Sequence, residues 1–169
     1  MILTINSKTH GIHDVLIDDD DYEKIKDYKW NVLKKSNGIY IICTARTADR
    51  KRHTLRMQRV IMNCNSGMDV DHVNGNTLDN RKSNLRICTH TENMRNMSKR
   101  KNVTSVYKGV YFNKSRNKWT ASIRINGTLK HLGHYKTEDQ AAISYNISAV
   151  KYFGEFARPN INIMMRKAV

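Results

Sequence analysis

Apolar and polar residues alternate over residues 68–73, which predicts a short strand ending at the turn-forming run Asn74-Gly75-Asn76. Residues 85–88 predict a second short strand. Thr89 and Glu92 then form a capping-box pattern, which starts a helix. The middle of the chain therefore predicts a strand, a long polar loop, a second strand and a short helix.

Residues 1–62 have the pattern of a compact lead-in module. Residues 18–28 are acidic and helix-like, and Asp19 or Asp20 is expected to cap that helix. The Asn-Gly pair at 37–38, followed by an apolar run, predicts a hairpin.

The last third of the chain predicts three strands. Strands are expected over residues 106–112 and 118–125, and Asn126-Gly127 predicts a tight hairpin into a third strand through Leu132. In the second strand one face carries Trp119, Ala121, Ile123 and Ile125, and the other carries Thr120, Ser122 and Arg124. One face can therefore pack against a core while the other contacts a partner.

A helix is expected after this sheet. Thr137 and Gln140 form a capping-box pattern, and Gly154 ends the helix. The stripe expected to pack on the sheet consists of Ala141, Tyr145, Ala149 and Phe153. The fold class is therefore α+β: a small α+β lead-in and a strand-strand-helix core precede a three-stranded antiparallel sheet packed on one helix.

Composition suggests where the modules meet. Residues 98–105 are basic and lack apolar periodicity, as is typical of a linker. We expect a first domain over 1–97, with its core at 68–97, a second domain over 106–160, and a tail over 161–169.

Charge is unevenly distributed along the 169 residues, and the net charge is +15. The first 27 residues hold 7 of the 15 acidic and 3 of the 30 basic residues. The rest is strongly basic, which indicates a polyanionic partner such as nucleic acid. A solubilising surface and RNA binding are alternatives that charge alone leaves open.

Other classes of protein are disfavoured. The sequence has no apolar run long enough to cross a membrane and no signal-peptide pattern, so we expect a soluble, cytoplasmic protein with no membrane partner. Its three cysteines, Cys43, Cys64 and Cys88, are widely spaced and predict neither a disulfide framework nor a zinc site.

The predicted strand-loop-strand-helix segment carries residues suited to metal-assisted hydrolysis. Asp71 and Asn93 offer hard oxygen ligands of the kind that Mg²⁺ accepts beside water and phosphate. His72, at the end of a strand, could take a proton from water near neutral pH. Each residue alone is more often structural, but their joint order favours a site.

These residues resemble the HNH endonucleases with a ββα-metal active site, in particular the homing-endonuclease branch of phages and introns. The match runs through DH, NG, DNR, SNLR, the Thr that opens the helix, and EN followed by a second Asn. The resemblance implies that Asp71 and Asn93 bind Mg²⁺ or another divalent metal such as Mn²⁺, and that His72 is the general base. It also implies that Asn84 ties the loop and aims His72. Arg59, Arg81 and Arg86 are candidate DNA contacts.

Residues 107–160 are similar to the DNA-binding domain of the plant Apetala and ethylene-response factors. The shared landmarks are Tyr107, Gly109, Val110, Trp119, Ala121, Ile123, Arg124, Leu132, Gly133, Ala141, Ala142, Tyr145, Gly154 and Asn160. The resemblance implies that the sheet binds DNA, and the candidate contacts are Lys108, Tyr111, Lys114, Arg116, Lys118, Trp119, Arg124, Lys130 and His131. Trp119 has a second interpretation, as a core aromatic.

Together these features predict a metal-dependent, site-directed endonuclease that acts on double-stranded DNA and needs no small-molecule cofactor. A monomer is favoured over a dimer, and one active site per monomer predicts a nick in one strand. The alternatives are a noncatalytic DNA-binding regulator and an RNA-binding protein.

Overall fold

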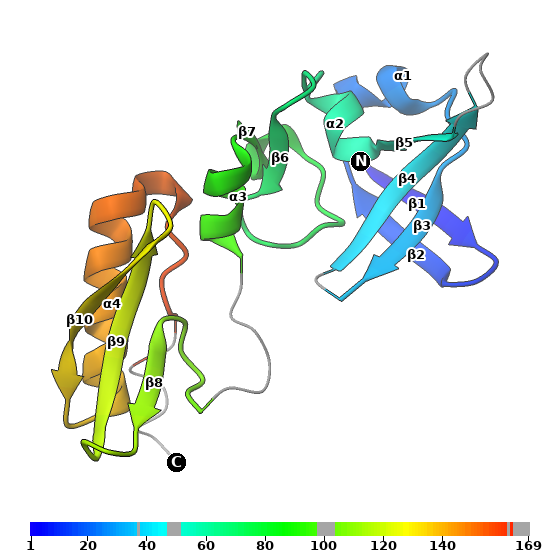
Figure 1. Ribbon diagram of the computed structural model, residues 1–169. Coiled ribbons are helices and arrows are strands. Elements are labelled where there is room, and N and C mark those ends of the chain that lie inside the picture. Colours follow the sequence, from blue (N-terminus) through cyan, green and yellow to red (C-terminus); the bar gives the residue numbers. More distant parts are fainter. Residues whose placement is uncertain (37, 47–51, 98–103, 162, 164–169) are drawn as a thin grey trace. The chain divides into compact units, whose positions relative to one another are not determined.

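The fold is described by a computed structural model, which covers residues 1–36, 38–46, 52–97, 104–161 and 163 (Figure 1). Short helices are combined with antiparallel sheets, so the α+β prediction is confirmed. The chain divides into two compact units, residues 1–93 and residues 94–169. No helix in these described ranges is long and apolar enough to span a membrane. The predicted linker 98–105 and tail 161–169 lie largely outside the described residues.

The first unit begins with a hairpin and a three-stranded sheet. Its elements are β1 (Ile2–Ser7), β2 (Gly11–Leu16), η1 (Asp19–Asp21), α1 (Tyr22–Ile25), β3 (Asn31–Lys35), β4 (Gly38–Arg46), β5 (Arg52–Arg56) and α2 (Met57–Ile61). The expected hairpin is β3–β4, paired antiparallel from Lys35 and Gly38 onward, although residue 37 of its Asn-Gly pair lies outside the described residues.

The acidic segment 18–28 differs from its prediction. It forms a 3-10 turn and a helix of four residues rather than one helix over the segment. Asp18 is the N-cap residue of the 3-10 turn, and no side chain caps it, so the prediction that Asp19 or Asp20 caps a helix is wrong. Long-range contacts account for this, because Asp18 and Asp21 bind Lys82, which follows them by more than 60 positions in the sequence.

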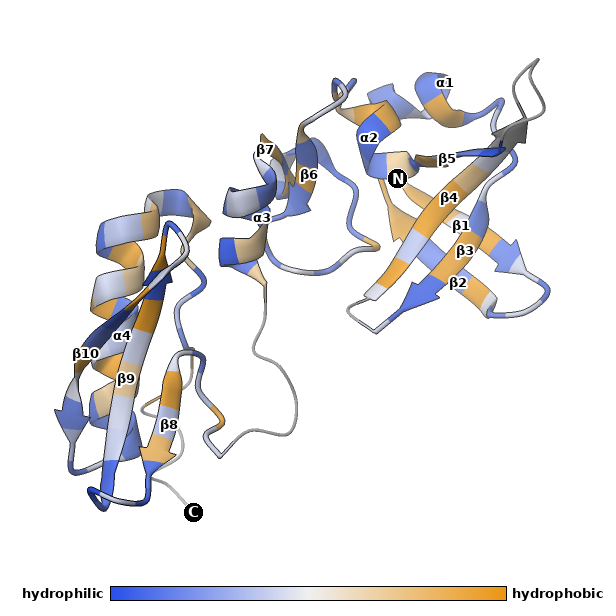
Figure 2. Cartoon of the chain, in the orientation of Figure 1, coloured by the Kyte–Doolittle hydropathy of each residue, from blue (hydrophilic) through white to orange (hydrophobic). Residues whose placement is uncertain are grey.

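Both units enclose apolar cores, and Figure 2 shows hydrophobic residues along β4, β9 and α4. The core of the first unit consists of Ile5, Val15, Ile17, Ile25, Val32, Ile41, Met57, Ile61, Val70 and Leu85. It therefore joins the lead-in elements to β6 (Asp69–His72) and β7 (Leu85–Cys88). The lead-in and the strands of the predicted site form one packed body.

The strand-strand-helix prediction is confirmed. β6 and β7 pair antiparallel, with Asp71 opposite Arg86 and His72 opposite Leu85. The 3-10 turn η2 (Lys82–Asn84) precedes β7, and α3 (His90–Asn96) follows it. The capping box forms as expected: the Thr89 amide donates to Glu92 Oε2 at 2.8 Å, and the Glu92 amide donates to Thr89 Oγ1 at 3.2 Å.

The second unit is a three-stranded antiparallel sheet covered by one helix. Its elements are β8 (Val110–Asn113), β9 (Lys118–Ile125), β10 (Thr128–Tyr135), α4 (Glu138–Phe153) and η3 (Gly154–Phe156), with strand order β10-β9-β8. The capping box of Thr137 and Gln140 is present, and the predicted stripe of α4 is buried on the sheet.

Two strands of the second unit differ from prediction. β8 begins at Val110 rather than at residue 106, because Ser105 and the Val106 amide bind the Glu138 carboxylate and the Tyr107 hydroxyl binds Asp139. β10 extends to Tyr135 and has an irregular register between His131 and Gly133.

Candidate active site

Asp71 and His72 lie at the end of β6, where the chain enters the polar loop of residues 73–84. Neighbouring side chains of a strand point to opposite faces, so the two residues face different surroundings. Both are almost enclosed, with 7% and 5% of their surface exposed. Buried ionisable groups need polar partners, and the loop and β7 supply them.

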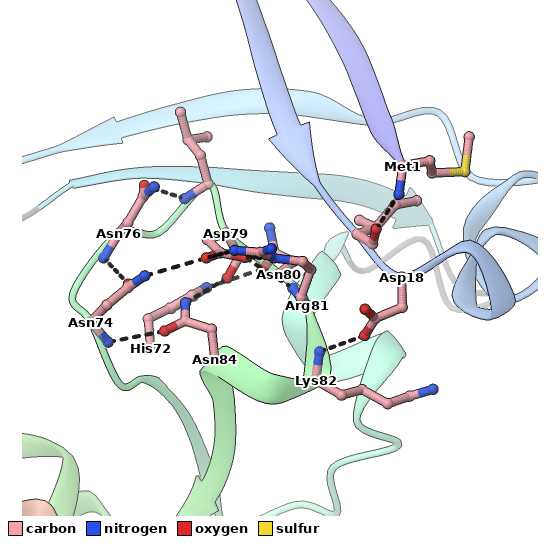
Figure 3. Close-up of polar contacts among 12 residues, drawn as sticks. Met1, Asp18, His72, Asn74, Asn76, Asp79, Asn80, Arg81, Lys82 and Asn84 are labelled. Carbon is pink, nitrogen blue, oxygen red and sulfur yellow. Dashed lines mark hydrogen bonds and ion pairs between the residues drawn. The ribbon is translucent and has the colours of Figure 1, made fainter.

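Asn84 joins the two ends of this loop (Figure 3). Its Oδ1 accepts from the Asn74 amide at 3.0 Å, and its Nδ2 donates to the Asp79 carbonyl at 2.8 Å. The loop therefore closes around one carboxamide. This contact agrees with the loop-tying role implied by the resemblance, while the aiming of His72 by Asn84 stays a prediction.

A direct hydrogen bond to His72 comes from Asn80. The Asn80 Oδ1 atom lies 3.1 Å from His72 Nε2, and both residues are buried (Figure 3). Burial lowers the pKa of His72, and this effect outweighs the Asn80 hydrogen bond and the charges of Asp71 and Asp79, which raise it. The lowered pKa favours the neutral imidazole, the form in which a general base acts.

Asp71 is held by Arg86 across the β6–β7 pair. Both Nε and Nη2 of Arg86 donate to Asp71 Oδ2, at 3.0 and 2.7 Å. The side chains of Arg86 and Asp71 are only 13% and 8% exposed. This guanidinium balances a carboxylate that would otherwise be costly to bury.

Asn93 lies on the first turn of α3, and its amide contacts β6. Asn93 Nδ2 donates to Asp69 Oδ2 at 3.0 Å, and His90 Nδ1 lies 3.1 Å from the same oxygen. The Asn93 hydrogen bond and the His90 interactions hold the pKa of Asp69 below its usual value, against the effect of burial. Asp69 and Asp71 share one face of β6, and Asn93 and His90 of α3 contact the Asp69 carboxylate.

This donor set suits a hard divalent ion. Asp71 and Asn93 would supply a carboxylate and an amide oxygen, with water and phosphate completing the shell, as Mg²⁺ accepts. Among the described residues, no three His, Cys, Asp or Glu side chains gather into a cluster of metal ligands. The oxygen atoms of Asp71 and Asn93 fit an ion that keeps water and phosphate among its ligands.

The basic side chains predicted to contact DNA near the site are bound to the protein itself. Arg59 donates to the carbonyls of Met68 and Asn65, at 2.5 and 2.8 Å. Arg81 forms two hydrogen bonds with Asp79, both 2.8 Å long. As described above, Arg86 binds Asp71, so DNA contacts by these three residues stay predictions.

The sheet of the second unit places several predicted DNA contacts on one surface. The strand register puts Tyr111, Lys118, Ser122, Arg124, His131 and His134 on the side opposite α4, which we call the outer face. Thr120 lies on the same side but is fully buried, and its hydroxyl is hydrogen-bonded to His134. Lys114 and Arg116 lie in the exposed turn between β8 and β9. Charged and aromatic side chains therefore flank a shared polar surface.

Three other predicted contacts lie elsewhere in the second unit. Trp119 packs edge-on against Phe112 on the side toward α4, and Lys130 binds the Tyr152 hydroxyl of α4 at 2.7 Å. Lys108 Nζ donates to the carbonyls of Arg95 and Met97, at 2.6 and 2.8 Å. These packing contacts support the interpretation of Trp119 as a core aromatic residue.

Sequence reasoning passed over Asn80, Asp69 and His90 as site residues. Asn80 belongs to the DNR run, whose composition also fits an ordinary turn. Asp69 could have been found from its position two residues before Asp71, which places both on one strand face. His90 carries no such signal, because an exposed residue beside a helix cap is usually structural.

Comparison with known proteins agrees with this geometry. A family model described as HNH endonuclease matches residues 63–95. The chain is 34% identical over 141 residues to "Uncharacterized HNH endonuclease L560" of Acanthamoeba polyphaga mimivirus, covering 83% of this chain and 71% of the relative. It is 36% identical over 61 residues to "Protein 3.8" of Escherichia phage T7, covering 36% of this chain and 50% of that protein. No solved structure matches. The chain therefore belongs to the HNH endonuclease family.

Proposed function

We propose that this protein is a metal-dependent, site-directed endonuclease of the homing type, which hydrolyses a phosphodiester of double-stranded DNA with water activated by His72. The observation that carries the proposal is the enclosed His72 imidazole, hydrogen-bonded to Asn80 and adjacent to Asp71 at the end of β6. A general base needs a fixed ring in its neutral form; the Asn80 hydrogen bond and the burial that lowers the pKa of His72 support this role.

Asp71 and Asn93 would hold a divalent ion, Mg²⁺ or a similar metal such as Mn²⁺. When bound, such an ion supplies positive charge for the scissile phosphate and the leaving oxygen. His72 takes the proton of the attacking water. Besides the ion, Arg86 would place a positive charge next to the Asp71 carboxylate. This guanidinium reduces the negative charge that the site presents to the phosphate.

The second unit would hold the target. Its outer face carries Lys118, Arg124 and His131, and Lys114 and Arg116 extend from the adjacent turn. Cationic side chains position the phosphate backbone, while polar and aromatic groups contact base edges. The resemblance of residues 107–160 to the plant Apetala-type domain supports this role. One active site in a monomer would cut one strand.

A second candidate function is noncatalytic DNA-binding regulation, and one observation favours it. The Asp71 carboxylate binds Arg86, and the Asn93 amide binds Asp69, so both metal ligands already have partners within the chain. In a regulator, this network would only stabilise the fold. The two functions differ in the effect of divalent metal: a nuclease cuts DNA when metal is added, whereas in a regulator metal changes at most the affinity for DNA.

The deciding experiment sequences the ends and nicks formed in a large DNA pool incubated with the protein. Mg²⁺ and EDTA are compared, and the His72→Ala variant is run beside the natural protein, with Ser7→Ala as a control that keeps the site. Discrete sites that need metal, persist in the control and vanish in His72→Ala would support the nuclease. Tight binding with every strand intact under several divalent metals would instead favour the regulator.

A further inference from the structure

The hydrogen bonds around His72 leave one buried donor without a partner. Asn80 is 1% exposed, and its Nδ2 atom is buried with no hydrogen-bond partner among the described residues. An unpartnered buried amide donor destabilises the folded state, because it loses its hydrogen bonds to water. An apolar residue would avoid this cost, so the benefit of Asn80 lies in its other atom, Oδ1, which contacts His72.

The backbone of Asn80 is anchored to the lead-in elements. Its amide donates to the Leu16 carbonyl at 2.8 Å, and the Leu16 amide donates to the Leu78 carbonyl at 2.9 Å. Two residues further along, the Lys82 amide donates to Asp18 Oδ2 at 2.7 Å (Figure 3). The loop around Asn80 is therefore fixed to the end of β2, which gives the side chain a defined starting point.

We propose that Asn80 is the positioning residue of the general base, which fixes the tautomer of His72. An amide oxygen accepts and cannot donate, so Oδ1 requires the proton to reside on Nε2 of the imidazole. The lone pair is then on Nδ1, and this atom receives the proton of the attacking water. The inference rests on the proposed function of His72 and adds the residue that sets which ring nitrogen reacts.

The reverse orientation of the Asn80 amide would direct Nδ2 at His72 and give the opposite tautomer. The two tautomers are therefore separable by measurement. We would label the imidazole nitrogens of the full-length protein with ¹⁵N and record long-range ¹H–¹⁵N correlation spectra at a pH where the ring is neutral. His72→Gln identifies the His72 signals by their loss. We expect a protonated Nε2 and an unprotonated Nδ1, and a protonated Nδ1 would overturn the proposal without any Asn80 variant.

Variants then test whether Asn80 causes this state. Asn80→Ala should allow both tautomers and lower the single-turnover cleavage rate about 10- to 100-fold, by analogy with the loss of a hydrogen-bond partner that orients a metal-bound histidine. Asn80→Asp keeps an acceptor oxygen and should restore the Nε2–H tautomer and most of the rate. Ser7→Ala, which removes another buried polar group of the first unit, should change neither.

Several outcomes would count against the role of Asn80. An unchanged tautomer in Asn80→Ala, or an Asn80→Asp variant as slow as Asn80→Ala, would each overturn it. A thermal melt establishes that each variant is folded before it is compared. If no form of the protein cuts DNA, the nuclease proposal fails, while the nitrogen spectra still decide the tautomer.

Discussion

Replacing Arg86 with Met tests how the chain accommodates the buried charge of Asp71. Arg86 makes two hydrogen bonds to one oxygen of this carboxylate, at 2.7 and 3.0 Å, and neither side chain is more than 13% exposed. Removing one partner of a buried ion pair typically costs about 3–5 kcal/mol, because the other charge stays buried. Solvent screening lowers this value little at such low exposure.

The two tryptophans allow the effect to be assigned to one unit. Trp30 lies in the first unit and Trp119 in the second, so a Trp119→Phe background leaves Trp30 fluorescence as the probe. Urea slopes of about 1–3 kcal/mol/M convert the expected loss into a midpoint lower by more than about 1 M in EDTA. Arg86→Lys keeps the positive charge but lacks the planar guanidinium, so its urea midpoint should lie between those of the natural protein and Arg86→Met. The exposed Arg52→Met control should stay within about 0.5 kcal/mol.

Divalent metal should restore part of this loss. A ligand at 100 times its Kd stabilises the folded state by about 2.7 kcal/mol, and an ion held by Asp71 would also neutralise the carboxylate that Arg86 no longer balances. Repeating the titration of Arg86→Met with Mg²⁺ or Mn²⁺ measures this recovery. A midpoint equal to that of the natural protein in EDTA would refute the ion-pair argument. A loss that no divalent metal reverses would refute Asp71 as a ligand.

Three further predictions concern the base, the second unit and DNA binding. Because burial lowers the pKa of His72, the base stays neutral to lower pH than a free histidine does. A plot of the logarithm of the single-turnover rate against pH should therefore change slope below pH 6.5, and a change of slope above this value would contradict the prediction. Gly109→Ala should destabilise the second unit by about 2–4 kcal/mol in thermal melts, because φ is +74° and the added methyl group would overlap the Tyr145 ring. Lys118→Ala or Arg124→Ala should weaken the salt dependence of duplex DNA binding, measured by anisotropy titrations at several salt concentrations. The slope of log affinity against log salt concentration should fall by about one in magnitude. An unchanged slope would exclude the outer face as the phosphate contact.

Elements set by local sequence were predictable. The capping boxes at Thr89 and Thr137, the strand Leu85–Cys88 and the alternating strand Lys118–Ile125 all depend on residues within a few positions of one another. The placement of Asp71, His72 and Asn93 at a strand end and on the first turn of a helix follows from the same short patterns. For these features, tertiary contacts reinforce the local preference.

Features that depend on distant residues were not predictable. β8 starts late because the residues before it bind Glu138, more than 30 positions further along the chain. The β1–β2 hairpin and its attachment to the loop at Asn80 depend on backbone contacts with no side-chain signature. Whether the Asn80 side chain turns toward His72 depends on this attachment, so the sequence could offer it only as a turn residue.

The acidic start of the chain acquires a different meaning from this arrangement. As sequence, seven acidic residues among the first 27 only reduce the positive charge of the first unit. In the structure, Asp21 is enclosed and pairs with Lys24 and Lys82, at 2.7 and 2.8 Å. Burial raises the pKa of Asp21, but these two ammonium groups outweigh it and lower the pKa. Lys82 follows Asn80 by two residues, so the acidic residues of the lead-in stabilise the loop that holds His72. The segment least suited to binding DNA therefore supports the residue that is proposed to activate water for DNA cleavage.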